Sequence, residues 1–175
     1  MALKASAMAA AFILCCQVAA AAEDDPCTRF TWDVSHELAV MKEQPRALIA
    51  ASNPRSDLSR LDLNTPYEIT LADQSAATFV ITPGKPTLPD GAHAGILRFR
   101  TDQAGRYRIS ITSGHWIDVI DGTAMLKSRD FQGARGCERP RKIVEYDLPG
   151  GRELTLQLSG AADASILLAV TTVAK

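Results

Sequence analysis

The stretch from Gly105 to Gly122 constrains the fold of this chain more than any other part of it. Its sequence, GRYRISITSGHWIDVIDG, alternates apolar and polar residues on both sides of Ser113 and Gly114. A period of two is typical of half-buried β-strands, and glycine provides the positive φ that a tight hairpin loop requires. The stretch therefore predicts a β-hairpin that turns at Ser113 and Gly114.

Further runs with the same period predict a mainly β fold. Short strands are expected at residues 48–51, 67–71, 78–82, 97–100, 142–148, 154–158 and 165–173. Turn residues separate them at roughly ten-residue spacing, which is typical of an antiparallel β-sandwich or jelly roll. The last run is nearly all apolar, which indicates a central strand that is covered on both faces.

One α-helix is expected before these strands, at about residues 33–43. Val34, Leu38 and Met41 recur with the spacing of one helix face. Asp33 is a suitable N-cap residue. We therefore predict a β-sandwich with one N-terminal α-helix, which packs on a face or an end of the β-structure.

Residues 1–22 have the pattern of a secretory signal peptide. Lys4 supplies a short positive beginning, residues 9–18 are apolar, and small residues end the segment at Ala22. The apolar run is too short to span a bilayer. After cleavage we expect one domain, residues 23–175, without a transmembrane segment and located in the periplasm or secreted.

Cleavage would leave two cysteines, Cys27 and Cys137. An even count in an oxidising compartment favours a disulfide, and closing so long a loop would stabilise the fold by roughly 4–5 kcal/mol. The alternative is a redox or metal-binding pair, although the chain has no C-x-x-C motif. Loss of Lys4 would shift the formal net charge from −1 to −2, so the charge balance predicts no nucleic-acid partner.

A basic segment, which also contains Phe131, is expected to form a surface loop that Cys137 holds in place. Its positive residues are Lys127, Arg129, Arg135, Arg139, Arg141 and Lys142, against only Asp130 and Glu138. Arg129, Arg135 and Arg139 are candidates to bind an anionic partner, such as a lipopolysaccharide phosphate or an acidic protein. The alternative is a solvated surface loop whose charge serves solubility.

Trp116 and Asp118 are the candidates for a carbohydrate site. Strand alternation places them on one face with Ile120, opposite His115. If that face is exposed, an aromatic platform beside a carboxylate suits a sugar. The alternative is that Trp116 fills the core or packs under the helix.

The sequence also permits two enzymatic interpretations. His36, His93 and His115 could form a metal site with Glu37 or Asp118, or they could be scattered packing residues. A hydrolase would need a serine beside His115, but no G-x-S-x-G is present. Strand alternation also separates His115 from Asp118, which disfavours a local catalytic triad.

Three segments of the second half carry a family resemblance: GRYRISI, HWIDVIDG and KIVEYDLPGGRELTLQLSGAADASILLAV. Together, over about Ala94 to Val173, they resemble small secreted β-sandwich proteins of Gram-negative bacteria. The last segment is similar to the bacterial pre-peptidase C-terminal type of domain. These motifs are structural, so the resemblance implies a fold and no catalytic residue. Some proteins that look like this one are labelled homogentisate dioxygenase, an enzyme that holds iron with two His and a carboxylate.

Taken together, these patterns predict an exported, non-catalytic binding or accessory module of the periplasm or cell surface. Its expected ligand is a glycan, an envelope component or another protein, and no cofactor is expected. The alternative is an enzyme, either a metal-dependent one, as the dioxygenase label implies, or a hydrolase.

Overall fold

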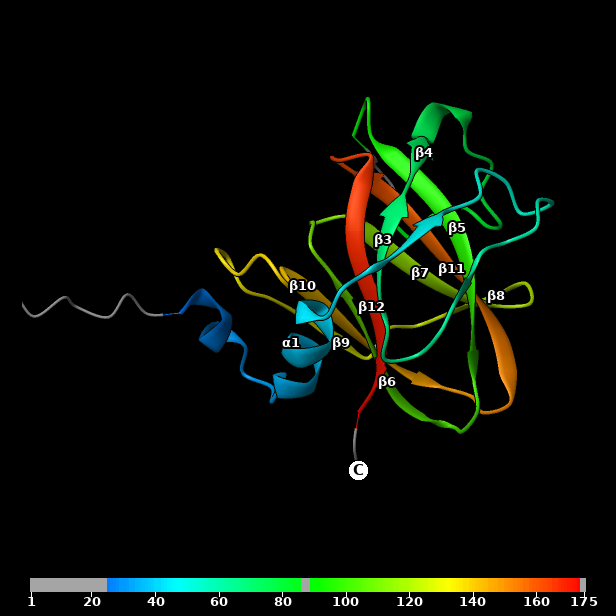
Figure 1. The fold of residues 1–175 in the computed structure, drawn as a ribbon. Helices are drawn as coiled ribbons and strands as arrows, with labels where there is room; N and C mark the ends of the chain where they lie inside the picture. Colours follow the sequence, from blue (N-terminus) through cyan, green and yellow to red (C-terminus); the bar gives the residue numbers. More distant parts are fainter. Residues whose placement is uncertain (1–24, 86–88, 174–175) are drawn as a thin grey trace, which may run out of the picture.

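The computed structural model describes residues 25–85 and 89–173, which form a two-layer β-sandwich (Figure 1). The predicted fold class is therefore confirmed. The expected signal peptide, residues 1–22, lies outside the described residues. Within the two described ranges, no helix combines the length and the apolar character needed to cross a membrane.

Six strands form the first sheet, sheet A. Their spatial order is β1 (Arg46–Ile49), β3 (Pro66–Thr70), β12 (Ser165–Thr172), β6 (Gly105–Ile111), β10 (Lys142–Leu148) and β9 (Asp130–Gly133). All neighbours in this sheet are antiparallel except β1 and β3. β12 lies inside the sheet and is buried along most of its length, as its apolar sequence predicts.

The second sheet, sheet B, covers the other side of the core. Its strands are β2 (Arg60–Leu61), β5 (His93–Thr101), β11 (Arg152–Ala161), β7 (Trp116–Asp121) and β8 (Ala124–Leu126), with β4 (Ala72–Asp73) paired to β5. Only β2 and β5 are parallel neighbours. The chain thus returns to sheet B several times after entering sheet A.

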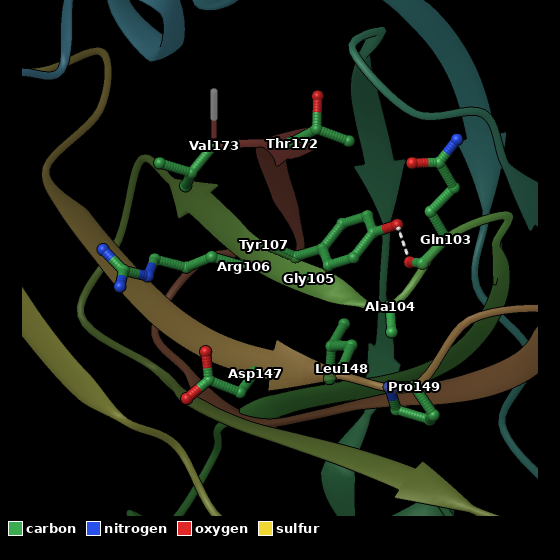
Figure 2. Close-up of a pocket in the computed structure, with 10 residues that line it drawn as sticks. All are labelled: Gln103, Ala104, Gly105, Arg106, Tyr107, Asp147, Leu148, Pro149, Thr172 and Val173. Carbon is green, nitrogen blue, oxygen red and sulfur yellow. Dashed lines mark hydrogen bonds between the residues drawn. The ribbon is translucent and has the colours of Figure 1, made fainter. Parts of the chain in front are cut away.

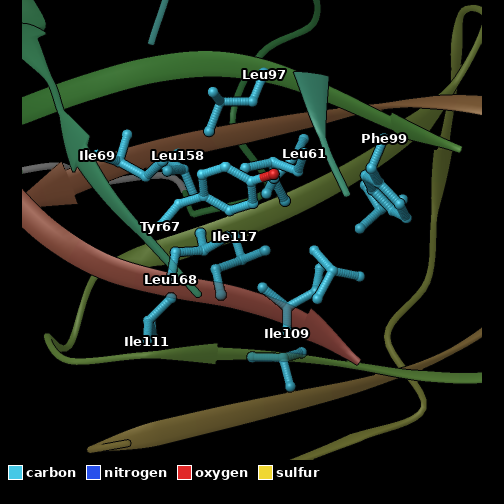
Figure 3. Packing of buried hydrophobic residues seen from close by; sticks show 14 of the residues in the cluster. Leu61, Tyr67, Ile69, Leu97, Phe99, Ile109, Ile111, Ile117, Leu158 and Leu168 are labelled. Atoms are coloured by element: carbon cyan, nitrogen blue, oxygen red, sulfur yellow. The ribbon is translucent and has the colours of Figure 1, made fainter. Parts of the chain in front are cut away.

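The core lies between the two sheets and is built from the inward residues of both. Figure 3 shows Leu97 and Ile117 of sheet B packed with Ile109, Ile111 and Leu168 of sheet A. Ile109, Ile111 and Leu168 are fully buried. Truncation of such a side chain to alanine typically costs about 2–5 kcal/mol, so this layer fixes how the sheets pack.

The hairpin predicted at Ser113 and Gly114 is wrong. β6 pairs with β10 and β12 in sheet A, whereas β7 pairs with β11 and β8 in sheet B. Residues 112–115 therefore cross from one sheet to the other, and Gly114 is not in the positive-φ region. Strands on opposite sides of a core alternate in the same way as strands in one sheet, so the pattern alone could not distinguish these arrangements.

The tight hairpin instead joins β7 to β8. Asp121 pairs with Ala124, which leaves Gly122 and Thr123 as a two-residue loop. Gly122 has a φ of 62°, the left-handed conformation that glycine adopts without steric cost.

The strand predicted at residues 78–82 is also wrong. Residues 77–85, which we call the strap, run over the outer face of sheet B without joining it. The Gln157 side chain binds the strap backbone: it accepts from Val80 N at 2.9 Å and donates to Ile81 O at 3.0 Å. Because a side chain satisfies these backbone groups, the segment needs no neighbouring strand.

Helix α1 (Ser35–Lys42) lies close to its expected position, between the 3₁₀ helices η1 (Pro26–Arg29) and η2 (Gln74–Ala76) in the sequence. Its N-cap is Val34 rather than Asp33, although Asp33 accepts a hydrogen bond from Ser35 N at 3.0 Å. The buried side of α1 includes Glu37, which is only 1% exposed. A charged residue on that side was not expected from the apolar spacing.

A buried group on sheet A explains the position of Glu37. Arg108 donates to Glu37 Oε2 at 3.2 Å and to Glu145 Oε2 at 3.0 Å. The same guanidinium donates to the Asp33 carbonyl at 2.7 Å and lies 4.8 Å from the ring centroid of Trp32. We call Arg108, Glu37, Glu145 and Trp32 the arginine cluster. It fastens the N-terminal segment to the outer face of sheet A.

A disulfide holds the same N-terminal segment at a second point. Cys27 and Cys137 are bonded, with their Cα atoms 4.8 Å apart, so the predicted pairing agrees with the structure. Cys137 is buried beside Ile143 of β10. The bridge therefore ties the segment before α1 to the turn between β9 and β10.

Candidate ligand-binding site

Lys142 brings aromatic residues from the two sheets into one cluster. Its Nζ lies 5.7 Å from the ring centroid of Trp116 on β7 and 5.8 Å from that of Phe131 on β9. Trp116 is 36% exposed and Phe131 is 64% exposed. We call Trp116, Phe131, Lys142 and the neighbouring Lys85 the aromatic–lysine site.

The strand register explains how this site forms. Lys142 lies on the same face of β10 as Val144 and Tyr146, which belong to the core, because residues two apart in a strand share a face. Phe131 is paired opposite Val144 on β9, the edge strand of sheet A. The side chains of Lys142 and Phe131 therefore project from the core-facing side of sheet A, near the margin of the sheet. There they meet Trp116, the first residue of β7.

Only part of the hydrogen-bonding capacity of the Lys142 ammonium is used within the described residues. It donates to the His115 carbonyl at 3.0 Å, and an ammonium has three N–H donors. In the part of the chain that the structure describes, no carboxylate lies within ion-pair distance of Lys142 or Lys85. Burial, and secondly the positive charge of Lys85, lowers the pKa of Lys142. The site therefore offers positive charge and free donors next to apolar rings.

Asp118 is buried next to the aromatic–lysine site, where it holds Trp116 in position and is not available to a ligand. It is only 3% exposed. Its Oδ1 accepts from Trp116 Nε1 at 2.8 Å, and its Oδ2 accepts from Gly84 N at 3.2 Å. The prediction that Asp118 contacts a sugar is thus replaced by a positioning role, because these bonds fix the indole ring and the strap together.

The strap approaches Trp116 too closely for a larger residue at position 84. A Cβ on Gly84 would lie 2.9 Å from Asp118 Oδ1 and 3.1 Å from Trp116 Nε1. The Met125 sulfur would lie at 3.4 Å. Glycine at this position therefore permits the hydrogen bond between Gly84 N and Asp118.

The neighbouring His115 is a packing residue with one local partner. Its Nδ1 lies 2.6 Å from Ser113 Oγ, and its Nε2 has no hydrogen-bond partner in the described residues. Burial, and secondly the charge of Lys142, lowers the pKa of His115 to about 3. So weak a base cannot efficiently activate Ser113 as a nucleophile near neutral pH.

The structure does not bring the three histidines together. His36 lies 2.9 Å from Asn64 Oδ1, and His93 lies 3.5 Å from Asp73 Oδ1, while His115 pairs with Ser113. Within residues 25–85 and 89–173, no group of three or more His, Cys, Asp or Glu side chains could hold a metal ion. The facial triad considered from the sequence does not form.

The basic segment is partly ordered as β9, and its arginines are dispersed. Arg129 donates to Asp147 at 2.9 Å and lies 3.5 Å from Glu145, so its charge is balanced within the protein. Arg135 is exposed, and its carbonyl accepts from Arg29 at 3.2 Å. Neither arginine belongs to the aromatic–lysine site.

Arg139 lies apart from both the aromatic–lysine site and the ion pairs of Arg129. It lines a cavity of about 570 Å³ together with Arg141. The same cavity is lined by the acidic residues Glu68, Glu138 and Asp163. This balance of charges does not favour an anionic ligand over a cationic one.

A larger cavity, of about 890 Å³, lies beside the beginning of β6 (Figure 2). Arg106 and Asp147 contribute opposite charges to its lining, and the Tyr107 hydroxyl donates to the Gln103 carbonyl at 2.7 Å. None of the site residues predicted from the sequence lines it. It therefore provides space without an evident charge preference.

Comparisons with known proteins place few constraints on the function. No family model and no curated protein matches the chain. Among solved structures, a β-glucosidase from Kluyveromyces marxianus in complex with glucose is similar at a TM-score of 0.33 and 11% identity. The match covers 48% of this chain and 10% of that one. A similarity of this extent assigns no activity, and the resemblance to pre-peptidase C-terminal domains stays a prediction.

Proposed function

We propose that the chain is an exported, non-catalytic binding or accessory module of the periplasm or cell surface, and that its aromatic–lysine site binds a glycan. The observation that supports this is the Lys142 ammonium, which is flanked by two exposed rings and has no carboxylate partner in the described residues. Aromatic rings pack on the apolar faces of sugars, and a few polar groups orient the ligand.

The export part of the proposal rests on two observations. The first 22 residues have the pattern of a signal peptide. The Cys27–Cys137 disulfide is of the kind that persists in oxidising compartments. Intact-mass analysis of the exported protein should give a chain that starts near Glu23 and gains two protons on reduction. A chain that retains Met1 in the cytosolic fraction would contradict export.

Glycan binding can be tested with variants that remove one aromatic ring of the site each. Trp116→Ala and Phe131→Ala should each weaken binding on a glycan array by about tenfold or more, since stacking contacts dominate such surfaces. Ile49→Ala is the matched control, because Ile49 is 71% exposed and lies on β1, outside the site. Equal binding by all three variants, or binding of a protein or lipid but of no glycan, would reject the assignment.

A further inference from the structure

We infer that the ligand of the aromatic–lysine site is an acidic glycan, a chain of pyranose rings that carry carboxylates. This inference rests on the proposed function and narrows its ligand class. The argument uses the donors of Lys142, the placement of the rings, the charges of the site and its open shape.

The donors of Lys142 are suited to a carboxylate. One N–H of the ammonium is directed to the His115 carbonyl at 3.0 Å, which leaves two for a ligand. Hydrogen bonds between an ammonium and a carboxylate are shorter and stronger than those to a neutral hydroxyl. A sugar that carries a carboxylate therefore gains more from this position than a neutral sugar does.

The two rings bracket the position of that carboxylate. Trp116 and Phe131 lie at nearly equal distances from the same Nζ, on strands of different sheets. A chain that places an acidic group at Lys142 can therefore rest sugar rings on one or both aromatic side chains. An anion without such rings, such as a simple acidic peptide, would leave these surfaces unused.

The charges around the site favour an anion further. Lys85 lies near enough to affect Lys142 electrostatically. Asp118, the carboxylate that accepts from the Trp116 ring, is buried and also accepts from Gly84. An incoming carboxylate would thus meet two ammonium groups, while Asp118 is held by its own donors.

The open shape of the site suits a polymer rather than a small enclosed ligand. Trp116 and Phe131 are exposed at the surface, and the linings of four cavities in the described residues include neither ring nor Lys142. Enclosed pockets bury most of a small ligand, whereas an exposed platform contacts one face of a longer chain. The site therefore fits a segment of polysaccharide that lies across the sandwich margin.

The test uses uronate-containing oligosaccharides, their carboxyl-reduced counterparts and polyglutamate. Isothermal titration should show that the wild-type chain binds at least one uronate oligosaccharide about tenfold more tightly than its reduced form. Lys142→Met should abolish this preference, and Lys142→Arg should retain most of it. Met keeps an apolar stem of similar length, so the comparison isolates the charge.

Each other outcome rejects a defined part of the account. Equal affinity for the acidic and reduced forms would overturn the acidic-glycan inference and leave glycan binding intact. Equal affinity for polyglutamate would show a general anion surface and also overturn it. If none of the acidic or neutral oligosaccharides binds, the proposed function itself fails. Circular dichroism of both Lys142 variants establishes that they are folded.

Discussion

Two groups of charged residues on this protein have opposite characters. In the arginine cluster, Arg108 is buried and is bonded to Glu37, Glu145 and the Asp33 carbonyl. In the aromatic–lysine site, Lys142 has no carboxylate partner among the described residues and lies beside two exposed rings. Both contain a cation on an aromatic face. The difference in pairing indicates that the first group stabilises the fold and the second is available for a ligand.

The largest expected effect comes from breaking the arginine cluster. Arg108→Met would leave Glu37 and Glu145 buried without their main cation, which typically costs about 3–5 kcal/mol. Urea denaturation should show this loss in the free energy of unfolding. Glycan affinity of the folded fraction should remain within about twofold of the wild type. A loss below about 1 kcal/mol would mean that the cluster does not anchor the N-terminal segment.

The buried His115 beneath the site should make stability depend on pH. Its pKa is about 3 in the folded chain and 6.5 in the unfolded chain, so only the unfolded chain takes up a proton between these values. Stability from this residue is complete above pH 6.5 and falls by up to about 1.4 kcal/mol per pH unit as the pH decreases toward 3. His115→Gln, measured by urea denaturation at several pH values, should have a shallower decline. An unchanged slope would show that His115 is accessible to protons in the fold.

The support of Trp116 by the strap can be tested at Gly84. Gly84→Ala would force Asp118 or Trp116 to move and should destabilise the fold by about 1–3 kcal/mol. The Trp116 indole N–H signal in NMR spectra should shift as well. Gly105→Ala is the control, since a Cβ there meets nothing within 4 Å. If Gly84→Ala and Gly105→Ala have the same stability and the same indole N–H signal, the strap does not hold Trp116 in position.

A smaller effect distinguishes the two turns of the central stretch. Gly122→Ala should cost about 1–2 kcal/mol because alanine is strained at its φ of 62°. Gly114→Ala should change the unfolding free energy by no more than about 0.5 kcal/mol, since a Cβ there meets nothing within 4 Å and its φ is not positive. If thermal denaturation shows a larger loss of stability for Gly114→Ala than for Gly122→Ala, the tight turn lies at Gly114, as the sequence predicted.

The smallest stability effect is expected at Lys142. Lys142→Met should change the unfolding free energy by less than about 1 kcal/mol, because the substitution removes a partly buried charge that repels Lys85. Urea denaturation of Lys142→Met and Arg108→Met compares the contributions of the two cations to the free energy of unfolding. A loss as large as that of Arg108→Met would show that Lys142 is a structural residue.

The sequence predicted the layers of this fold better than their connections. Alternation identified most strands, and the apolar run of β12 correctly indicated a central position. Alternation could not show that β6 and β7 lie in different sheets, because both arrangements place Ile109 and Ile117 in the core. Nor could it show that Gln157, a distant side chain, would bind the strap and keep residues 78–82 out of a sheet.

The candidate site was only half visible in the sequence. Trp116 was a candidate on the condition that its strand face is exposed, and Phe131 and Lys142 were noted within the basic segment. Their meeting depends on the packing of β9 and β10 against β7, which is a contact between sheets. Asp118 was assigned to the ligand because its neighbours Gly84 and Trp116 could not be recognised as its hydrogen-bond donors.

The most direct test of the central claim is reductive methylation of the lysines with and without a uronate oligosaccharide, followed by mass spectrometry of the peptides. The account predicts that the ligand protects Lys142 and Lys85, whereas the exposed Lys42 and Lys127 are modified equally in both samples. Protection of Lys42 and Lys127 to the same extent, or modification of Lys142 that the ligand does not change, would contradict the claim that this site binds an acidic glycan.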